Sequence, residues 1–285
     1  MPGKLVFVGI PFIKGHGTQN DFVVLPDIDG ELELTATKVA TLCDRRAGVG
    51  ADGVLRVVRA AALGEPLPQD VPADAMFMDY RNADGSIAEM CGNGVRVFAA
   101  HLADAGLLTP GDFAVGTRAG LRRGTVHPDG LVTVHMGVAT VSDKSTATVE
   151  GVAYEGLAVD VGNPHLVCPV DVDLAELYLK VPPGHDPAVF PHGVNVEFIT
   201  ELDEYTVRMR VHERGVGETL SCGTGTVAVT AAVLHAAGQT EGVRDVLVPG
   251  GQVRVSVSAT GCTLTGPAEL VARGELDEVW WHGIA

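Results

Sequence analysis

Residues 218–234, ETLSCGTGTVAVTAAVL, place a cysteine where polar chain gives way to Gly-Thr-Gly and a long apolar run. Residues 88–103, AEMCGNGVRVFAAHLA, repeat this design around Cys91. In the earlier stretch Val95, Phe98 and Leu102 fall on one face at helical spacing, which predicts an amphipathic helix. The chain is therefore predicted to begin a helix directly after a cysteine twice, once at Cys91 and once at Cys222.

The first backbone N–H groups of a helix lack partners within the helix and carry a partial positive charge. A thiol at that place is expected to have a lowered pKa, so that more of it is thiolate near neutral pH. The glycines that follow each cysteine remove Cβ atoms and let a ligand approach the backbone. Because a carboxylate can bind the same N–H groups, each cysteine is predicted to lie beside a carboxylate site.

The two halves of the chain share a plan beyond the cysteines. Each half has an asparagine near a predicted strand start, in TQNDFVV (18–24) and VGNPHLV (161–167). This pattern favours an internal duplication. We expect an N-terminal half, 1–134, that carries Cys91, with the tail 273–285 packed back on it. The C-terminal half, 135–272, carries Cys222 and is predicted to include a helix over 173–179, DLAELYL.

Composition limits the partners. The 285 residues carry a formal net charge of −16, which disfavours nucleic acid and anionic membrane surfaces. Five scattered cysteines without a CxxC pair argue against a disulfide framework and a structural metal site. Neither a signal peptide nor a membrane-spanning stretch is expected, so the sequence predicts a cytoplasmic protein with free thiols. Cys43, Cys168 and Cys262 are expected to be small buried apolar residues.

Two thiols of this kind suggest a reaction. If one thiolate removes the α-proton of an amino acid and a thiol on the other side returns a proton, the carbon is inverted. The helix N–H groups would stabilise the enolate-like intermediate, each donor by about 3–4 kcal/mol. Such a scheme needs no cofactor and no metal.

The segments GHGTQNDFVV, YRNADGSIAEMCGNGVR, VGNPHLV, GVNVEF and HERGVGETLSCGTGT resemble the motif set of diaminopimelate epimerase, in the same order along the chain. The resemblance implies an α/β (α+β) fold of two pseudo-symmetric halves, each a mostly antiparallel sheet wrapped around a central helix. It also implies a homodimer that acts without pyridoxal phosphate in lysine and peptidoglycan biosynthesis.

The resemblance assigns roles to particular residues. Cys91 and Cys222 match the acid–base pair, the first as proton donor and the second as acceptor from the LL to the meso isomer. His165 and Glu213 match the groups that support catalysis beside the reacting carbon. The residues that match substrate-binding positions are Asn20, Asn82, Gly92, Asn93, Asn163, Asn195, Glu213, Arg214, Gly223 and Thr224.

Several of these residues have an ordinary structural interpretation as well. Asn82 in RNADGS fits a turn, and Asn163 precedes a proline. Glu213 and Arg214 fit a solvated pair at a strand end. One position departs from the family, because Gly53 stands where some members have a glutamine, so that no side-chain contact to substrate is available there.

We expect an epimerase that interconverts LL- and meso-2,6-diaminopimelate. Three alternatives stay open at this point: a racemase of the proline racemase kind, a hydrolase with a single nucleophilic cysteine, and a binding protein without activity. Arg214 distinguishes these alternatives, because its guanidinium could bind the distal carboxylate of diaminopimelate, whereas a small substrate has no such group.

Overall fold

The computed structural model describes residues 9–284, and the chain divides into two compact units. The first unit holds residues 9–17, 21–130 and 268–284, and the second holds 18–20 and 131–267. The three-residue segment 18–20 thus groups with the second unit, although its neighbours in the chain belong to the first. The expectation of no signal peptide concerns the N-terminal stretch, of which residues 1–8 lie outside the described residues.

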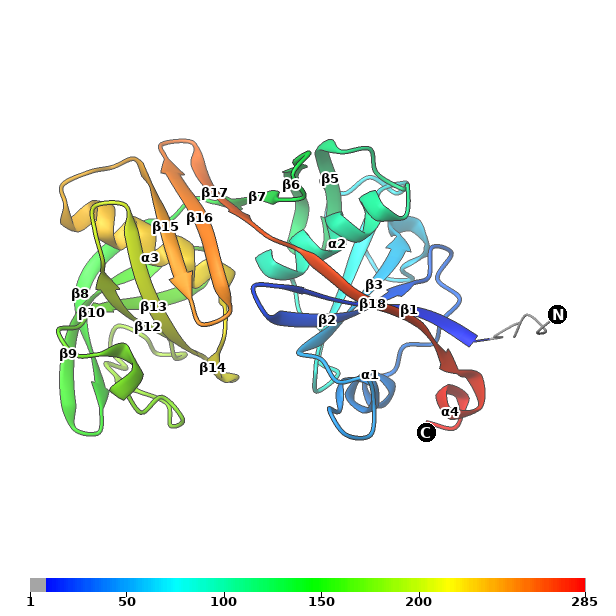
Figure 1. Ribbon diagram of the computed structural model, residues 1–285, viewed down its shortest axis with the longest axis horizontal. Coiled ribbons are helices and arrows are strands. Elements are labelled where there is room, and N and C mark those ends of the chain that lie inside the picture. The colour runs from blue at the N-terminus through cyan, green and yellow to red at the C-terminus, as the bar shows by residue number, and fades with distance from the viewer. Residues whose placement is uncertain (1–8, 285) are drawn as a thin grey trace. The chain divides into compact units, whose positions relative to one another are not determined.

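In the first unit a mixed sheet surrounds α2, with strand order β18-β1-β2-β3-β4-β5-β6 (Figure 1). Most of its neighbouring strands are antiparallel, but β3 runs parallel to β2 and β5 parallel to β4. The strands are β1 (Gly9–Gly17), β2 (Asn20–Pro26), β3 (Gly53–Arg59), β4 (Met76–Asn82), β5 (Gly111–Thr117), β6 (Gly120–Val126) and β18 (Glu269–Asp277). The helices are α1 (Ala36–Cys43), η1 (Ala60–Ala62), α2 (Gly92–Asp104) and α4 (Glu278–His282).

The second unit repeats this arrangement around α3 (Gly223–Ala236), with strand order β8-β9-β10-β12-β13-β15-β16-β17-β7. Its parallel pairs, β10 with β12 and β13 with β15, occupy the equivalent places. The strands are β7 (Val132–Gly137), β8 (Thr140–Val149), β9 (Val152–Asp160), β10 (Pro164–Pro169), β11 (Gly184–His185), β12 (Asn195–Glu201), β13 (Thr206–Glu213), β14 (Gly217–Thr219), β15 (Gly242–Val248), β16 (Gly251–Ser258) and β17 (Gly261–Gly266). The predicted fold of two similar halves, each a sheet around a helix, is confirmed.

Strand register makes the repeat specific to single residues. The parallel pair β2–β3 places Phe22 beside Gly53, and the parallel pair β10–β12 places His165 beside Asn195. Phe22 therefore corresponds to His165, and Gly53 to Asn195. Two residues further along β3 and β12, Leu55 corresponds to Glu197. The duplication preserves the backbone but changes the chemistry of its side chains.

The helix predicted over 173–179 does not form. Only a 3₁₀ turn, η2 (Leu174–Glu176), is present, and the chain at Leu177 is extended. Leu174, Leu177 and Leu179 are buried in one hydrophobic cluster. Arg210 donates to the carbonyl oxygens of Leu174 and Leu177, so these groups are satisfied without the i to i−4 bonds of a helix.

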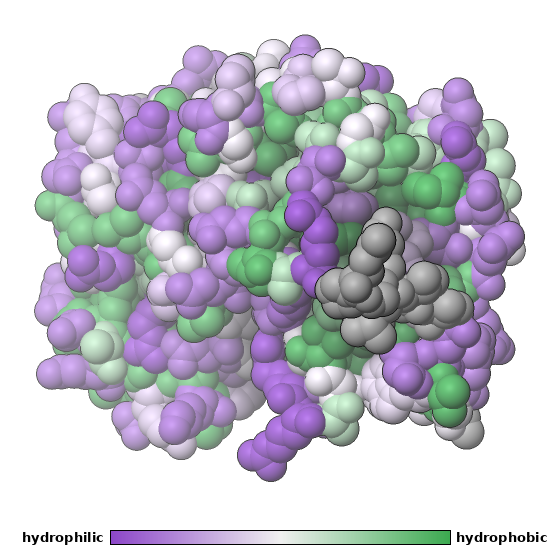
Figure 2. Space-filling model, turned by 45° about the vertical axis from the view of Figure 1, so that its right-hand side comes forward, coloured by the Kyte–Doolittle hydropathy of each residue, from purple (hydrophilic) through white to green (hydrophobic). Residues whose placement is uncertain are grey.

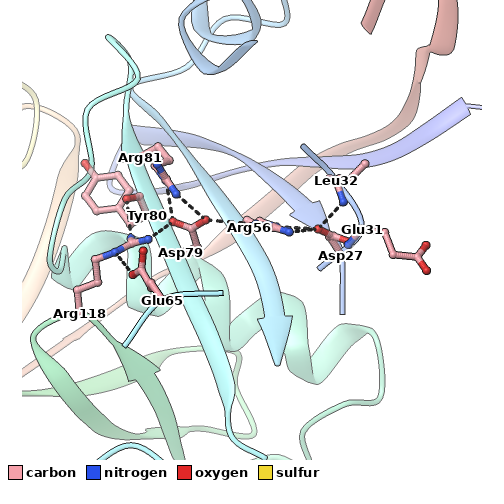
Figure 3. A network of polar contacts seen from close by, with 9 residues as sticks. All are labelled: Asp27, Glu31, Leu32, Arg56, Glu65, Asp79, Tyr80, Arg81 and Arg118. Carbon is pink, nitrogen blue, oxygen red and sulfur yellow. Dashed lines mark hydrogen bonds and ion pairs between the residues drawn. The ribbon is translucent and has the colours of Figure 1, made fainter. Parts of the chain in front are cut away.

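A buried ionic network fixes the sheet face of the first unit that lies away from α2 (Figure 3). Asp79 on β4 is fully buried and contacts Arg81 and Arg118 at 2.8 Å each and Arg56 at 3.8 Å. Arg56 also pairs with Asp27 at 2.6 Å, and that carboxylate accepts from the backbone of the following loop. Because Arg56 alternates with Leu55 along β3, the opposite face of this strand is left to apolar contacts with α2.

The C-terminal segment packs within the first unit. Trp281 in α4 is 1% exposed and lies in a cluster with Val39, Leu42 and Leu276. The ammonium group of Lys38 lies 5.4 Å from the centre of the Trp281 ring. This cation–π contact and the burial of the indole anchor α4 against α1.

Figure 2 shows hydrophilic residues over much of the visible face, with hydrophobic residues scattered among them in small groups. Such scattered apolar side chains are normal on protein surfaces. In the part of the chain that the structure describes, no helix has both the length and the apolar character needed to cross a bilayer.

Candidate active site

Cys222 is the N-cap residue of α3, with an extended backbone at φ −119° and ψ 114°. Its sulfur accepts a hydrogen bond from the backbone N–H of Gly225 at 3.4 Å. Gly223 and Gly225 are buried in the first turn of the helix. The sequence prediction of a thiol at a glycine-rich helix start is therefore realised at this position.

Polar side chains surround this sulfur on the second unit. Cys222 Sγ lies 3.5 Å from Thr224 Oγ1, and the Glu213 carboxylate at the end of β13 also interacts with the thiol. Thr219 donates its hydroxyl to Glu213 Oε1. The helix start, β13 and β14 thus contribute groups to one polar cluster.

A buried histidine–carboxylate pair lies beneath the same helix start. His165 on β10 is fully buried and places Nδ1 2.7 Å from Glu197 Oε1 and Nε2 3.1 Å from Asn163 Oδ1. The Asn163 amide nitrogen lies 3.4 Å from Thr224 Oγ1. A continuous series of polar contacts therefore leads from Glu197 through the imidazole to the residues beside Cys222.

Burial and these carboxylates set the charge of the thiol. Loss of water contact, then the charges of Glu213 and Glu197, raise the pKa of Cys222 well above its ordinary value. Burial likewise raises the pKa of Glu213. The expectation of a lowered thiol pKa is wrong for Cys222, because removal from water and two facing carboxylates outweigh the partial positive charge of the helix start. The raised pKa favours the thiol over the thiolate at Cys222.

Two further predicted residues form a pair at the ends of β12 and β13. Asn195 Oδ1 accepts from the backbone N–H of Arg214 at 2.9 Å, and its amide donates to Pro164 O at 3.2 Å. Arg214 is exposed and donates from Nη1 to His192 O at 3.0 Å. Asn195 thus ties the start of β10 to the backbone that carries the guanidinium.

The first unit has a different environment around its cysteine. Cys91 is the N-cap residue of α2 at φ −144° and ψ 122°, without the side-chain cap bond seen at Cys222. It is half-buried, whereas Gly92 and Asn93 behind it are buried. Arg96 in the same helix is fully buried, and burial lowers its pKa to about 10, while the charge of Cys91 acts in the opposite sense. The charged group that acts on Cys91 is thus the buried guanidinium of Arg96, whereas those that act on Cys222 are the carboxylates of Glu213 and Glu197.

The floor beneath the two helix starts differs in the same way. A Cβ on Gly94 would lie 3.3 Å from Leu55 and 3.6 Å from Phe22, both apolar. A Cβ on the equivalent Gly225 would lie 2.8 Å from the Glu197 carboxylate. The backbone of the two helix starts is alike, but Leu55 and Phe22 pack beneath the first and the buried acid Glu197 beneath the second. The two cysteines therefore lie in chemically different surroundings.

The remaining predicted residues lie at turns. Asn82 ends β4 and donates its side-chain amide to Ser86 Oγ at 3.0 Å, as its turn interpretation requires. Asn20 begins β2 and is half-buried. Gly53 has no room for the glutamine of some family members, since a Cβ there would lie 2.6 Å from Arg81 O and 2.8 Å from the Tyr80 ring.

Sequence reasoning missed Glu197. The signal was present in NVEFI, where an acid two residues after Asn195 interrupts an otherwise apolar strand. Its Oε2 atom is buried and has no hydrogen-bond partner among the described residues. The other cysteines behave as expected, because Cys43, Cys168 and Cys262 are buried, and burial raises the pKa of Cys43 and of Cys168 to about 12.

Comparison with known proteins supports the resemblance seen in the motifs. The family model "Diaminopimelate epimerase" matches residues 12–142 and 157–271. A diaminopimelate epimerase of Rhodococcus jostii is 55% identical over 96% of this chain and 99% of the relative, and one of Mycolicibacterium smegmatis is 54% identical over 96% and 99%.

Among solved structures, a hydroxyproline epimerase from Agrobacterium vitis matches 95% of this chain and 94% of its own, with a TM-score of 0.65 and 14% identity. That similarity concerns the fold alone. The sequence matches extend through both halves, including both cysteine motifs and the strands beside them. This chain is an enzyme of the diaminopimelate epimerase family.

Proposed function

We propose that the chain interconverts LL- and meso-2,6-diaminopimelate, with Cys91 and Cys222 as the two acid–base groups. The observation that carries the proposal is the setting of Cys222: a buried thiol at a glycine-rich helix start, in contact with a carboxyl group whose pKa burial raises. Acid–base groups placed in this way are typical of active sites. His165 and Glu197 are hydrogen-bonded to one another at 2.7 Å beneath the same helix start.

The thiol must lose its own proton before it can act as a base. Glu213 is the acceptor in contact with it, and transfer gives the Cys222 thiolate and a neutral Glu213 carboxyl group. The α-ammonium group of the substrate brings a positive charge beside the sulfur and so favours the thiolate. The thiolate then takes the α-proton, and the Cys91 thiol delivers its proton to the other side of the carbon, which leaves Cys91 as thiolate.

The helix starts hold the reacting end of the substrate. We propose that the backbone N–H groups at Gly92–Asn93 and Gly223–Thr224 bind the α-carboxylate and the enolate-like intermediate. Loss of a single donor of this kind costs about 3–4 kcal/mol of transition-state stabilisation in enzymes that use one. Since these donors already point outward in the free helix, no reorganisation is needed during the reaction.

The unreactive end of the substrate needs a second recognition site. We propose that Arg214 binds the distal carboxylate, and that Asn20, Asn82, Asn163 and Asn195 orient the two amino-acid ends. The Asn195 contact to the backbone of Arg214 supports this role. Proline, the substrate of a proline racemase, has no distal carboxylate. Arg214→Met should therefore weaken turnover of diaminopimelate and leave any turnover of proline unchanged.

Deuterium incorporation tests the proposal. Each purified protein is incubated with LL-diaminopimelate in deuterated buffer, and the label in both isomers is measured early. The wild type should place deuterium in the meso product and leave recovered substrate unlabelled. Cys91→Ala and Cys222→Ala should each lose about 10² to 10⁴ in rate. Full activity of Cys91→Ala together with loss of activity in Cys222→Ala would contradict the two-base proposal and favour a hydrolase with one nucleophilic cysteine. A wild type that binds diaminopimelate without exchange would be a binding protein.

We further propose that the enzyme acts in the cytoplasm, in lysine and peptidoglycan biosynthesis, as a homodimer and without pyridoxal phosphate. All five cysteines are free thiols, which persist in reducing compartments. Light scattering tests the dimer. Activity after exhaustive dialysis against a carbonyl reagent tests the independence from pyridoxal phosphate.

A further inference from the structure

The turn between β1 and β2 has an unusual backbone. Thr18 and Gln19 both have positive φ, at 50° and 62°, a region that side chains other than glycine rarely adopt. A β-branched residue such as Thr18 is especially strained there. Backbone strain of this kind persists where the surrounding structure holds it, and it is frequent at functional sites.

The surrounding structure that holds this turn belongs to the second unit. Thr18 is 2% exposed, and its hydroxyl lies 2.6 Å from the hydroxyl of Ser221, which is 3% exposed. The backbone of Gly250 packs closely against the same turn, because a Cβ atom on Gly250 would lie only 1.9 Å from Thr18 O. Gly250 in turn donates its backbone N–H to Leu220 O at 2.9 Å. Three segments distant in sequence therefore meet at one buried pair of hydroxyl groups.

The positions of the two hydroxyl groups suggest a purpose. Ser221 directly precedes Cys222, and Thr18 precedes Asn20 by two residues. Glycine would adopt a φ of 50° without strain, but it would lack the hydroxyl that reaches Ser221. Thr18 is therefore retained in a strained conformation, in which its side chain can hold the turn beside Cys222, the N-cap residue of α3.

We propose that the hydrogen bond between Thr18 and Ser221 is a positioning contact, which holds Asn20 and the Cys222 thiol in the relative arrangement that the substrate requires. Both residues act through their neighbours and touch no reacting atom. The inference rests on the proposed function, in which Asn20 binds substrate and Cys222 exchanges its proton.

Five variants test this contact in the intact chain. Thr18→Val and Ser221→Ala each remove one hydroxyl, and the double variant removes both. Thr18→Ser retains the hydroxyl and serves as the conservative control. Thr18→Gly removes the hydroxyl but relieves the backbone strain, so that it separates positioning from stability. For each variant we would measure kcat and KM with diaminopimelate, urea unfolding, and the rate at which iodoacetamide alkylates Cys222 without substrate.

Each single loss of a hydroxyl should lower kcat/KM about tenfold, the effect of one buried hydrogen bond. The double variant should lose no more than either single variant, because both remove the same bond. Thr18→Ser should retain wild-type kinetics. Thr18→Gly should unfold at a urea concentration no lower than the wild type does, yet share the kinetic loss of Thr18→Val.

Other outcomes would overturn the inference. A hundredfold loss in the double variant, or wild-type kinetics in Thr18→Gly, would show that the two hydroxyl groups act separately or only stabilise the fold. Alkylation distinguishes this failure from failure of the proposed function. If the wild type does not turn over diaminopimelate, the function is wrong, but a changed alkylation rate of Cys222 in Thr18→Val and Ser221→Ala would still establish the contact as a positioning one.

Discussion

Gly94 and Gly225 occupy the same place in the two halves, at the third residue of α2 and of α3, and alanine should be tolerated at position 94 but not at position 225. Alanine is favoured over glycine in a helix by up to about 1 kcal/mol. At position 94 the new methyl group would contact Leu55 at 3.3 Å, which requires only a small shift of a flexible side chain. Gly94→Ala should therefore change the free energy of unfolding by no more than about 1 kcal/mol.

At position 225 the methyl group would lie 2.8 Å from Glu197 Oε1, the atom that lies 2.7 Å from His165 Nδ1. The carboxylate must move, and a hydrogen bond to a charged group is worth about 1.5–3 kcal/mol. Overpacking adds about 1–3 kcal/mol and the helix gain returns about 1 kcal/mol, so we expect a net loss of about 1.5–5 kcal/mol.

Activity should follow the same contrast. Displacement of the carboxyl groups beneath Cys222 should lower kcat for diaminopimelate by about ten- to a hundredfold in Gly225→Ala, since small misplacements in active sites have effects of this size. Gly94→Ala should stay within about threefold of the wild type, because its methyl group would meet only carbon atoms, and its 3.5 Å approach to Cys91 Cβ is an ordinary van der Waals contact. Urea unfolding and the deuterium assay measure both quantities. Equal behaviour of the two variants would refute the claim that a buried acid distinguishes the two helix starts.

Further predictions concern the thiol, an ionic cluster and the C-terminal helix. Because the pKa of Cys222 is raised well above its ordinary value, its alkylation by iodoacetamide should still rise about tenfold per unit from pH 8 to pH 10, and a plateau below pH 9 would contradict this. Burial alone would raise the pKa of the half-buried Asp21, but its hydrogen bonds and ion pairs with Arg45 and Lys14 hold that pKa at about 2 instead of 3.8. Asp21 should thus stabilise the fold by about 2 kcal/mol above pH 4, and the difference from Asp21→Asn should shrink as the pH falls from about 4 to about 2. Trp281→Ala should lower the free energy of unfolding by about 3–5 kcal/mol in urea titrations, and a loss of only about 0.5 kcal/mol, as for a surface residue, would contradict the role of the indole in the core of the first unit.

The sequence was sufficient for the features that depend on local pattern. A cysteine followed by Gly-x-Gly and an apolar run predicts a helix start, and a helix begins directly after both Cys91 and Cys222. Motif order along the chain was enough to indicate the family, and the family implies the two-part fold. Local pattern failed over 173–179, because leucines spaced for a helix face can also fill a core from extended chain when Arg210 satisfies their carbonyl groups.

Only the tertiary structure decided what lies beneath each cysteine. Strand register, which joins residues about 30 apart in sequence, sets Glu197 against His165 in one half and leaves Leu55 and Phe22 in the other. The charge state of Cys222 follows from burial and from these carboxylates, neither of which a helix-start motif contains. The same holds for Thr18, which the chain places between strands of the first unit and the fold places against Ser221 in the second. Contacts between distant residues depend on packing of the whole unit, and a short motif carries no information about them.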